Sequence, residues 1–463
     1  MMKIEALNPV VCRVERQHFQ LILPALSCKA EYFRKERIPG TDRFRQVRYE
    51  YDKNFFIEKK GDFLYFYRGH LERVQQYLED LGLKPAEIFV YDKKEHYHQE
   101  YKLNGITFRP DQIKLMDAAL EEETGVILSP TGSGKTILQL GIMSAFPTKP
   151  ILLLSHTIDI IQQTFEELQK YGFDGIQQIG GGKRYTGWLD RIVVSTIQSI
   201  HKIDKKNYMD YFHVVMVDEA HRVSATDNMY AEVLRNLMAP IRLGFTATEP
   251  TSELGQMAME ALLGPVIGEL SIGEAAELGI LAKPRVKLLK TPYSPAIKQI
   301  KKYADVYQRG IVENNDRNNL IAHTIKKHSE AGDISLIFVN RIEHGTLIQE
   351  KFSDMGIHVP FVRGDMQPKE RLNIKHSLIE KRSRIAIATT AWREGVNIPS
   401  LDVIFNAGGG KDELGVLQLI GRGLRRTDDK ETVLIYDIFD PSHGYLISHF
   451  GERIVLYMEK EWL

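Results

Sequence analysis

The feature that most constrains this chain is the glycine-rich segment Ser129-Pro130-Thr131-Gly132-Ser133-Gly134-Lys135-Thr136. It follows the apolar run Val126–Leu128 and precedes a helical pattern that opens at Ile137. A strand, a glycine-rich loop and a helix in this order are typical of a phosphate-binding loop. Its glycines let successive amides point at the phosphates, and the helix N-terminus adds a favourable dipole. We expect Lys135 to reach the β and γ phosphates and Thr136 to hold Mg²⁺, although Ser129 stands where the general pattern has glycine.

A second motif places two carboxylates, Asp218 and Glu219, at the end of the apolar run Val214–Val217. A magnesium–nucleotide site needs this pair, one carboxylate to bind the metal directly or through water and one to polarise the attacking water. Together with the glycine-rich loop, the pair predicts an ATP-hydrolysing site with Lys135, Asp218 and Glu219 as catalytic groups and Thr136 and Asp218 as metal ligands.

Short β-branched runs alternate with helical stretches over most of the chain, which predicts parallel sheets covered by helices. We therefore expect an α/β fold with two tandem parallel-sheet lobes, spanning residues 101–281 and 282–463. Leu281–Pro284 is the predicted joint between them. The expected strands of the first lobe are Val126–Ser129, Ile151–Ser155, Ile192–Ser195, Val214–Val217 and Arg242–Phe245, and those of the second are Ser335–Val339, Ile385–Ala388, Val403–Asn406 and Val433–Ile438.

Residues 1–100 lack this alternation and predict a small α+β domain. Strand-like runs at Val10–Val14, Phe55–Glu58 and Phe63–Tyr67 precede a helical pattern from His70 to Leu83, and the polar stretch Asp92–Lys102 reads as a linker. Between Lys29 and Lys60, basic residues interleave with aromatic ones, which suits a surface that grips duplex DNA. Acidic residues in the same stretch leave an ordinary solvated face equally open.

Composition narrows the function classes without selecting one. Lys plus Arg (61) balances Asp plus Glu (61), so no global positive field indicates nucleic acid, and polyanion binding must come from local clefts. Cys12 and Cys28 show no metal-ligand spacing and are expected to be reduced thiols. The first residues lack a secretory signal, and no apolar run is long enough to span a bilayer. We therefore expect a soluble, cytoplasmic protein, in the host cytoplasm if the chain is of phage origin.

The ordered motifs from about Phe108 to Arg426 resemble those of superfamily 2 helicases of the DExH kind, here as Asp218-Glu219-Ala220-His221. The resemblance implies that the two parallel-sheet lobes are RecA-like and that ATP and Mg²⁺ are cofactors. It implies that the Phe108–Gln112 segment contacts adenine, with Phe108 and Arg109 beside the base and Gln112 reading its edge. It also implies that Thr246, Ala247 and Thr248 link hydrolysis to the grip on nucleic acid. Thr131, Gly132, Ser133 and Gly134 would complete the phosphate cradle.

Two further segments resemble motifs of the family's second lobe. Thr389–Pro399 resembles the segment that touches both ATP and strand, with Glu394, Gly395 and Asn397 on the nucleotide side; many relatives carry Asp where Asn397 stands. Gln418–Arg426 resembles the final motif, whose arginines reach across the cleft. Because phosphoryl transfer spreads charge over the γ oxygens, an inserted arginine stabilises that charge. Arg425 is the first choice for this role, Arg422 the second, and Gln418 belongs to the same catalytic motif.

The family's nucleic-acid strand is held mainly through phosphates by amides and hydroxyls. The matching positions, with the neighbouring basic pair, are His156, Thr157, Gly181, Gly182, Lys183, Arg184, Thr196, Gln198, Asn340, Arg341, Arg363, Gly364, Thr389 and Thr390. For each residue alone, a solvated loop remains the alternative.

Among relatives, the compact size, the DEAH form and the small N-terminal domain look most like phage recombination helicases of the UvsW type. That resemblance implies an ATP-dependent DNA helicase that migrates Holliday junctions, regresses forks and dissolves R-loops. Its expected partner is branched or forked DNA; no membrane is expected, and no protein partner is indicated. The alternatives are the motor subunit of a restriction complex, an RNA helicase, and a binding module with an inactive ATP fold.

Two groups of residues could suggest metal sites. Asp437, Asp440 and His443 could suggest a nuclease centre, and His96 with His98 could suggest zinc. Neither group has a complete ligand set, so structural roles are the favoured interpretation.

Overall fold

The computed structural model describes residues 2–37, 44–83, 87–90, 100–224, 228–250, 252–389, 392, 398, 401–410 and 430–463. The chain forms two compact units. The first comprises Met1–Ser129 and Gly134–Leu270, and the second comprises Pro130–Ser133 and Ser271–Leu463. The N-terminal domain and the first α/β lobe therefore belong to one unit, and the second lobe to the other.

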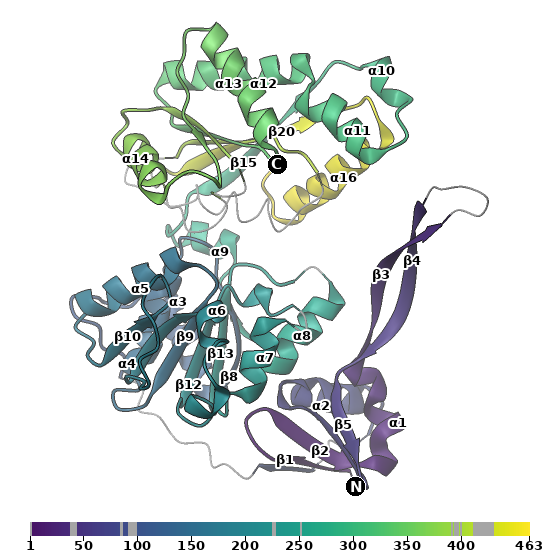
Figure 1. The fold of residues 1–463 in the computed structure, drawn as a ribbon, viewed down its shortest axis with the longest axis vertical. Helices are drawn as coiled ribbons and strands as arrows, with labels where there is room; N and C mark the ends of the chain where they lie inside the picture. Colours follow the sequence, from purple (N-terminus) through teal and green to yellow (C-terminus); the bar gives the residue numbers. More distant parts are fainter. Residues whose placement is uncertain are drawn as a thin grey trace. The chain divides into compact units, whose positions relative to one another are not determined.

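The first lobe is built on a parallel sheet that has seven strands within the described residues, in the order β10-β11-β9-β12-β13-β8-β14 (Figure 1). Its central strands are almost entirely buried and mostly apolar because helices cover both faces, with Arg242 as a buried charge on β13. The strands are β8 (Thr124–Leu128), β9 (Ile151–Ser155), β10 (Ile176–Ile179), β11 (Ile192–Thr196), β12 (Val214–Asp218), β13 (Ile241–Thr246) and β14 (Val266–Glu269). Each strand predicted for this lobe is present, with its ends shifted by two residues at most; β10 and β14 were not predicted.

Helices connect these parallel strands, as crossover connections require. They are α4 (Lys135–Ser144), α5 (Ile158–Lys170), α6 (Ile197–Ile200), α7 (Met229–Asn236) and α8 (Glu253–Leu263), and α3 (Pro110–Glu122) precedes the first strand, β8. Helices α3 and α4 pack closely, since a Cβ on Gly141 would lie 2.4 Å from Met116 Sδ and 2.9 Å from Phe108 Cε1. This contact fixes the start of α3 beside the glycine-rich loop.

The second lobe repeats the architecture, with a parallel sheet of six strands in its described part, ordered β15-β20-β19-β16-β18-β17. These are β15 (Lys283–Lys290), β16 (Ser335–Phe338), β17 (Phe361–Val362), β18 (Ile385–Ala388), β19 (Val403–Asn406) and β20 (Thr432–Phe439). The helices are α9 (Ile272–Glu277), α10 (Pro295–Lys298), α11 (Tyr303–Tyr307), α12 (Asn315–Ala331), α13 (Ile342–Asp354), α14 (Pro368–Ile379) and α16 (Gly444–Glu459), with a π-helical turn at Gln308–Val312. Lys283 and Pro284, predicted as part of a joint, begin strand β15, and the two units divide earlier, between Leu270 and Ser271.

The N-terminal domain has a mostly antiparallel sheet of five described strands, ordered β5-β6-β2-β1-β7, with helices at its face. The strands are β1 (Lys3–Ala6), β2 (Val11–Glu15), β5 (Phe56–Lys60), β6 (Phe63–Tyr67) and β7 (Glu87–Val90), and the helices are α1 (Phe19–Ile22) and α2 (Leu71–Asp80). The predicted α+β class is confirmed, and the predicted helix is present but shorter. Both cysteines are free and buried, as expected, and burial raises the pKa of the Cys12 thiol to about 12.

The stretch read as basic and aromatic forms a long hairpin of β3 (Ser27–Arg37) and β4 (Phe44–Asn54), which extends as a two-stranded arm from this domain (Figure 1). At its base, charges of opposite sign pair across the strands. Lys29 Nζ lies 2.7 Å from Asp52 Oδ1, and Arg48 of β4 pairs with Glu31 of β3 as well as with Glu50 on its own strand. Cross-strand pairing therefore neutralises part of the basic stretch that the sequence displays.

The N-terminal domain is packed against the first lobe through a shared core. Val10, Cys28, Phe55 and Tyr67 belong to the same buried cluster as Met257, Ala258 and Ala261 of α8. The residues predicted as a linker are described only from Glu100 onward, where Lys102 N donates to Ser144 Oγ at 3.1 Å. The domain is thus joined to the lobe by burial of apolar surface, which stabilises the joint in proportion to the area removed from water.

Within the described part of the chain, no helix has the length and apolar character needed to cross a membrane.

The packing of His70 in this joint predicts a pH dependence of stability. His70 is fully buried, and burial lowers its pKa from 6.5 to about 4. The folded protein therefore keeps His70 neutral, so its stabilisation is complete above pH 6.5 and is lost as the pH falls toward 4. The loss should be on the order of 3 kcal/mol, measured as the free energy of unfolding in urea at several pH values. His70→Gln should flatten this part of the pH profile, and an unchanged profile in this variant would show that His70 is not its source.

Candidate active site

The glycine-rich loop leaves β8 and enters α4 with a backbone that only glycine adopts readily. Gly132 and Gly134 have φ values of 88° and 98°, in the region where a Cβ is strained. Lys135 Nζ donates to Ser129 O at 3.0 Å, and Ser133 Oγ donates to Pro130 O at 2.8 Å. The loop is thus a compact turn with its lysine folded back over it, as a phosphate-binding loop requires.

Residues predicted to contact adenine lie beside this loop. Gln112 is buried, and its Oε1 accepts from Arg109 N at 3.1 Å, which caps α3. Arg109 pairs with Asp111, with Nη2 to Oδ2 at 2.9 Å. A Cβ on Gly134 would lie 3.1 Å from Gln112 Nε2. The start of α3 therefore closes on the glycine that begins α4, and a larger residue there would fill the space between them.

The two carboxylates lie at the end of β12. Asp218 Oδ1 accepts from Gln139 Nε2 at 3.2 Å, and burial together with the charge of Glu219 raises the pKa of Asp218, while Lys135 acts in the opposite direction. Gln139 was not predicted; its signal is its position four residues after Lys135, on the same face of an otherwise apolar helix. Glu219 adopts a left-handed backbone with φ of 54°, a conformation that is strained outside glycine and gathers at functional sites.

The groups at this site fit a hydrated Mg²⁺ ion. Thr136 and Asp218 offer the hard oxygen donors that the ion prefers, and one or two carboxylates suffice because it keeps several waters. Burial first, and then the charge of Glu219, raise the pKa of Asp218, and a cation would relieve the repulsion between the two carboxylates. When bound, Mg²⁺ would neutralise charge on the nucleotide phosphates; Thr136 and Asp218 would hold it, and Glu219 would orient the attacking water.

His221 lies between Glu219 and the segment predicted to couple hydrolysis with movement. His221 Nδ1 lies 2.9 Å from Thr246 Oγ1 and 3.5 Å from Glu219 Oε2. Thr246 Oγ1 donates to Thr248 O at 2.9 Å, so its hydroxyl hydrogen is used and His221 Nδ1–H must be the donor to it. Ser129 N also donates to Thr246 O at 2.9 Å, which ties the same residue to the phosphate loop. Ala247 and Thr248 follow at once, and Thr248 Oγ1 is buried with no partner among the described residues.

Several predicted nucleic-acid residues of the first lobe lie at one edge of the sheet. His156 with Thr157, the glycines after β10, and Thr196 with Gln198 follow the adjacent parallel strands β9, β10 and β11. Gln198 Nε2 lies 3.5 Å from His156 O, and a Cβ on Gly180 would lie 3.1 Å from Thr196 Oγ1. Gly181 and Gly182 form a tight turn with φ values of 64° and 92°. Lys183 Nζ bonds Gln178 Oε1 at 2.9 Å and lies over the Phe165 ring, while Arg184 is exposed.

The second lobe shows the same arrangement. Asn340 and Arg341 follow β16, Arg363 and Gly364 follow β17, and Thr389 follows β18, and these three strands are neighbours in the parallel sheet. Arg341 lies over the Tyr307 ring, 4.7 Å from its centroid, and bonds Gln308. Because parallel strands end at the same edge, both lobes gather their predicted contact residues there.

Other predicted site residues lie outside the described part of the chain. They are Thr390, Glu394, Gly395, Asn397, Gln418, Arg422 and Arg425. Their roles remain predictions from the resemblance, as do those of His96 and His98 as structural residues.

The carboxylates near the end of β20 have structural partners. Asp437 is fully buried and accepts from Arg453 Nε at 2.6 Å and from the Tyr457 hydroxyl at 2.6 Å. Asp440 pairs with buried Arg317, with Nε to Oδ2 at 3.2 Å, and His443 Nε2 lies 2.9 Å from Ile300 O. These ion pairs hold α12 and α16 to the sheet of the second lobe, which agrees with the structural interpretation.

Two family models match the chain. The model of the type III restriction enzyme res subunit matches residues 96–251, and that of the helicase conserved C-terminal domain matches residues 316–427. The chain belongs to the superfamily 2 helicases. It is therefore an ATP-dependent helicase. The loop, the carboxylates and the predicted coupling segment lie within residues 96–251, which the first family model matches.

Relatives extend the likeness beyond single motifs. The DNA 3'-5' translocase XPB2 of Sulfurisphaera tokodaii is 28% identical over 74% of this chain and 84% of its own. The ATP-dependent DNA helicase uvsW of Enterobacteria phage T4 is 22% identical over 72% of this chain and 71% of its own. Dbp5 of Saccharomyces cerevisiae, solved with RNA and ADP BeF3, gives a TM-score of 0.53 at 18% identity over 77% of this chain and 92% of that one, which confirms two RecA-like lobes. Two further relatives are longer proteins: the match covers 50% and 49% of their lengths, so this chain spans about half of each.

The position of Glu219 gives a first prediction for the helicase's chemistry. Glu219→Gln keeps the size of the side chain but cannot accept a proton from water, so ATP should still bind while its hydrolysis falls by at least about 10²-fold. Steady-state phosphate release and binding of a fluorescent ATP analogue measure the two effects. Glu122→Gln, at an exposed glutamate on α3, is the matched control. Hydrolysis at the parental rate in Glu219→Gln would show that another group activates the water.

The hydroxyl of Thr246 gives a second prediction, on coupling. Thr246→Val removes the acceptor of His221 and the donor to Thr248 O, whereas Thr246→Ser keeps both. The valine variant should hydrolyse ATP at much of the parental rate but displace strands about tenfold less well or worse, and the serine variant should resemble the parent. Strand displacement and phosphate release are measured in the same reactions. An equal loss of both activities in the valine variant would assign Thr246 to hydrolysis itself.

Proposed function

We propose that this helicase is an ATP-driven DNA translocase that remodels branched DNA, by migrating Holliday junctions, regressing forks and dissolving R-loops. DNA as the substrate is supported by the curated relatives, which are named as a DNA translocase and a DNA helicase and match about three quarters of the chain. Magnesium and ATP are the cofactors that the first-lobe motifs suit.

The observation that carries the branched-DNA proposal is the N-terminal domain. It lies almost wholly before residue 96, where the first family model begins to match, and it shares a buried core with the first lobe. A translocating core pulls on phosphates and cannot by itself distinguish a junction from a linear duplex. A second grip on another arm converts linear motion into movement of the branch point, and the β3–β4 hairpin is the element best placed in sequence and fold to supply it.

A second candidate has its own support. The match to the res subunit of type III restriction enzymes favours a motor subunit of a restriction complex. Such a motor would need nuclease and specificity partners, so its ATP hydrolysis would depend on those partners and on a recognition sequence. The branched-DNA proposal instead expects the isolated chain to be stimulated by DNA structure alone.

The test compares ATP-dependent processing of a four-way DNA junction and a model fork with unwinding of a tailed RNA duplex, using one preparation. We expect the DNA junction to be processed and to stimulate ATP hydrolysis more than linear duplex does. Because the grip is through phosphates, binding should weaken by on the order of 10³-fold between 50 and 200 mM salt if six or more are engaged. Glu219→Gln is the control that binds DNA without processing it.

Efficient RNA unwinding with inert DNA junctions would overturn this proposal and leave the helicase assignment standing. Deleting residues 1–100 is not a clean test of the second grip, because it would uncover the apolar face of α8 that the N-terminal domain buries. Point substitutions in the full chain are therefore preferable.

A further inference from the structure

The N-terminal domain meets α8 at a turn that tolerates only glycine. Gly69 lies in the short helical turn between β6 and α2, and a Cβ there would lie 1.9 Å from Glu260 O and 2.9 Å from Ala261 O. Its neighbour His70 is fully buried, with Nε2 2.9 Å from Met257 O. Since a carbonyl only accepts, His70 Nε2–H is the donor. The backbone of the turn at Gly69 therefore lies directly against the backbone of α8, which fixes the distance between the N-terminal domain and this helix.

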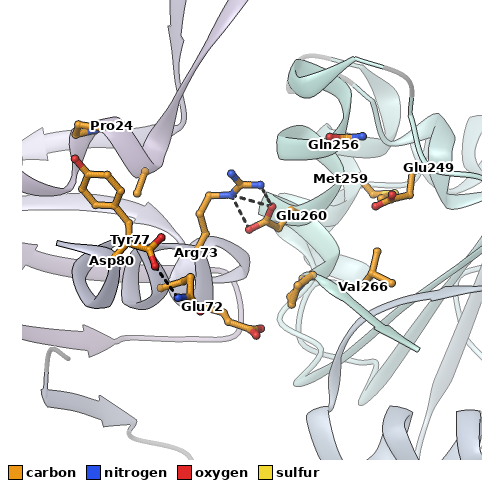
Figure 2. A pocket seen from close by; sticks show the side chains of 14 residues that line it. Pro24, Glu72, Arg73, Tyr77, Asp80, Glu249, Gln256, Met259, Glu260 and Val266 are labelled. Atoms are coloured by element: carbon orange, nitrogen blue, oxygen red, sulfur yellow. Dashed lines mark hydrogen bonds and ion pairs between the residues drawn. The ribbon is translucent and has the colours of Figure 1, made fainter. Parts of the chain in front are cut away.

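An ion pair completes the contact one helical turn further on (Figure 2). Arg73 Nε lies 3.0 Å from both carboxylate oxygens of Glu260, and Nη2 lies 2.6 Å from Oε2. The Glu260 side chain is only 13% exposed, and the pair stands at the wall of a pocket of about 570 Å³ between α2 and α8. A bidentate pair fixes orientation as well as distance, so it adds a rotational restraint to the close approach at Gly69.

Helix α8 is held near its start to the residues that follow the coupling segment, and near its end to strand β13. Its first turn follows Thr246–Thr248, and Gln256 Nε2 donates to Pro250 O at 3.0 Å. Near its last turn, buried Arg242 of β13 donates from Nε to Leu262 O at 2.9 Å. A Cβ on Gly244 would lie 3.0 Å from Leu263 Cδ1, so strand and helix pack without a gap. The N-terminal domain is thus fastened to the helix that leaves the coupling segment.

The β3–β4 hairpin is rooted at the same helix. Cys28, at the start of β3, belongs to the buried cluster that includes Met257 and Ala258 of α8. Phe55, which follows the end of β4, is buried in that cluster as well and makes an edge contact with His70 at 5.3 Å between ring centroids. Both ends of the hairpin are therefore set in the joint, while its strands extend away from it (Figure 1).

We propose that Gly69, His70 and Arg73 are positioning residues that lock the N-terminal domain and its hairpin to α8, so that the domain and the first lobe act as one rigid body throughout the ATP cycle. The hairpin then keeps a constant position on the first lobe, and the conformational change of the ATP cycle takes place elsewhere than at this joint. The proposal rests on the proposed function only in taking the hairpin as the second grip. The rigid joint can be measured without any DNA.

The ion pair provides a charge-swap test in the full chain. Arg73→Glu and Glu260→Arg each bring like charges together, whereas the double variant R73E/E260R restores the pair with reversed direction. Arg16→Glu, at an exposed arginine of the same domain, makes the same charge change away from the joint. Labels on Arg34→Cys in β3 and Asp159→Cys in α5 report the position of the hairpin on the lobe, since native Cys12 and Cys28 are buried.

We expect one narrow distance distribution between the labels, unchanged by ATP with Mg²⁺. It should broaden in both single variants, return in the double variant, and be unaffected by Arg16→Glu. Basal ATP hydrolysis should change less than twofold, while junctions processed per ATP should fall at least tenfold in the single variants and recover in the double variant. A distance that shifts with ATP in the parent, or single variants indistinguishable from it, would overturn the rigid joint. If the parent fails to process junctions but the distances behave as described, the proposed function fails and the rigid joint stands.

Discussion

The hydrogen bond from Ser129 N to Thr246 O is the interaction on which the arrangement of the site depends. It joins the first residue after β8 to Thr246, the last residue of β13, where one strand leads into the phosphate loop and the other into the predicted coupling segment. With β12 on the other side of β13, three strand ends carry the loop, the carboxylates and the coupling threonines. The register of a buried parallel sheet is strongly specified, so these groups are positioned by the core rather than by the loops themselves.

Charge and strain are concentrated at the same edge. Asp218 and Glu219 repel each other, Glu219 holds a left-handed backbone, and Thr248 keeps a buried hydroxyl without a partner among the described residues. Each of these costs stability, and the apolar strands β8, β12 and β13 beneath them supply the compensating burial. Binding of a nucleotide with its cation would complete such a site, because the cation would relieve the repulsion between Asp218 and Glu219.

Sequence patterns were sufficient to predict those parts of the site in which a chemical motif directly follows an apolar run of strand length. The glycine-rich loop, Asp218 with Glu219, and the strands around them were predicted because each motif sits directly after an apolar run whose length is that of a strand. Gln139 was not predicted because a glutamine in an apolar helix belongs to no motif, and its role depends on Asp218, 79 residues away. The joint at Gly69, His70 and Arg73 was not predicted either, because nothing near those residues in the sequence indicates a partner on α8. For the hairpin, the sequence left a DNA-gripping surface and an ordinary solvated face equally open, since the pairing of Lys29 with Asp52 depends on a strand register that composition does not reveal.

The shared core of the N-terminal domain and α8 also sets an order of events during synthesis. His70 and its acceptor Met257 are separated by 187 residues, so the domain leaves the ribosome long before its docking helix exists. At about 5–20 residues per second, the wait is on the order of 10 to 40 seconds. During that interval Val10, Cys28, Phe55 and Tyr67 lack the partners that bury them in the finished protein. The nascent chain therefore presents an apolar face that a chaperone can hold, and final closure of the domain is timed by translation of the first lobe rather than by the domain's own folding rate.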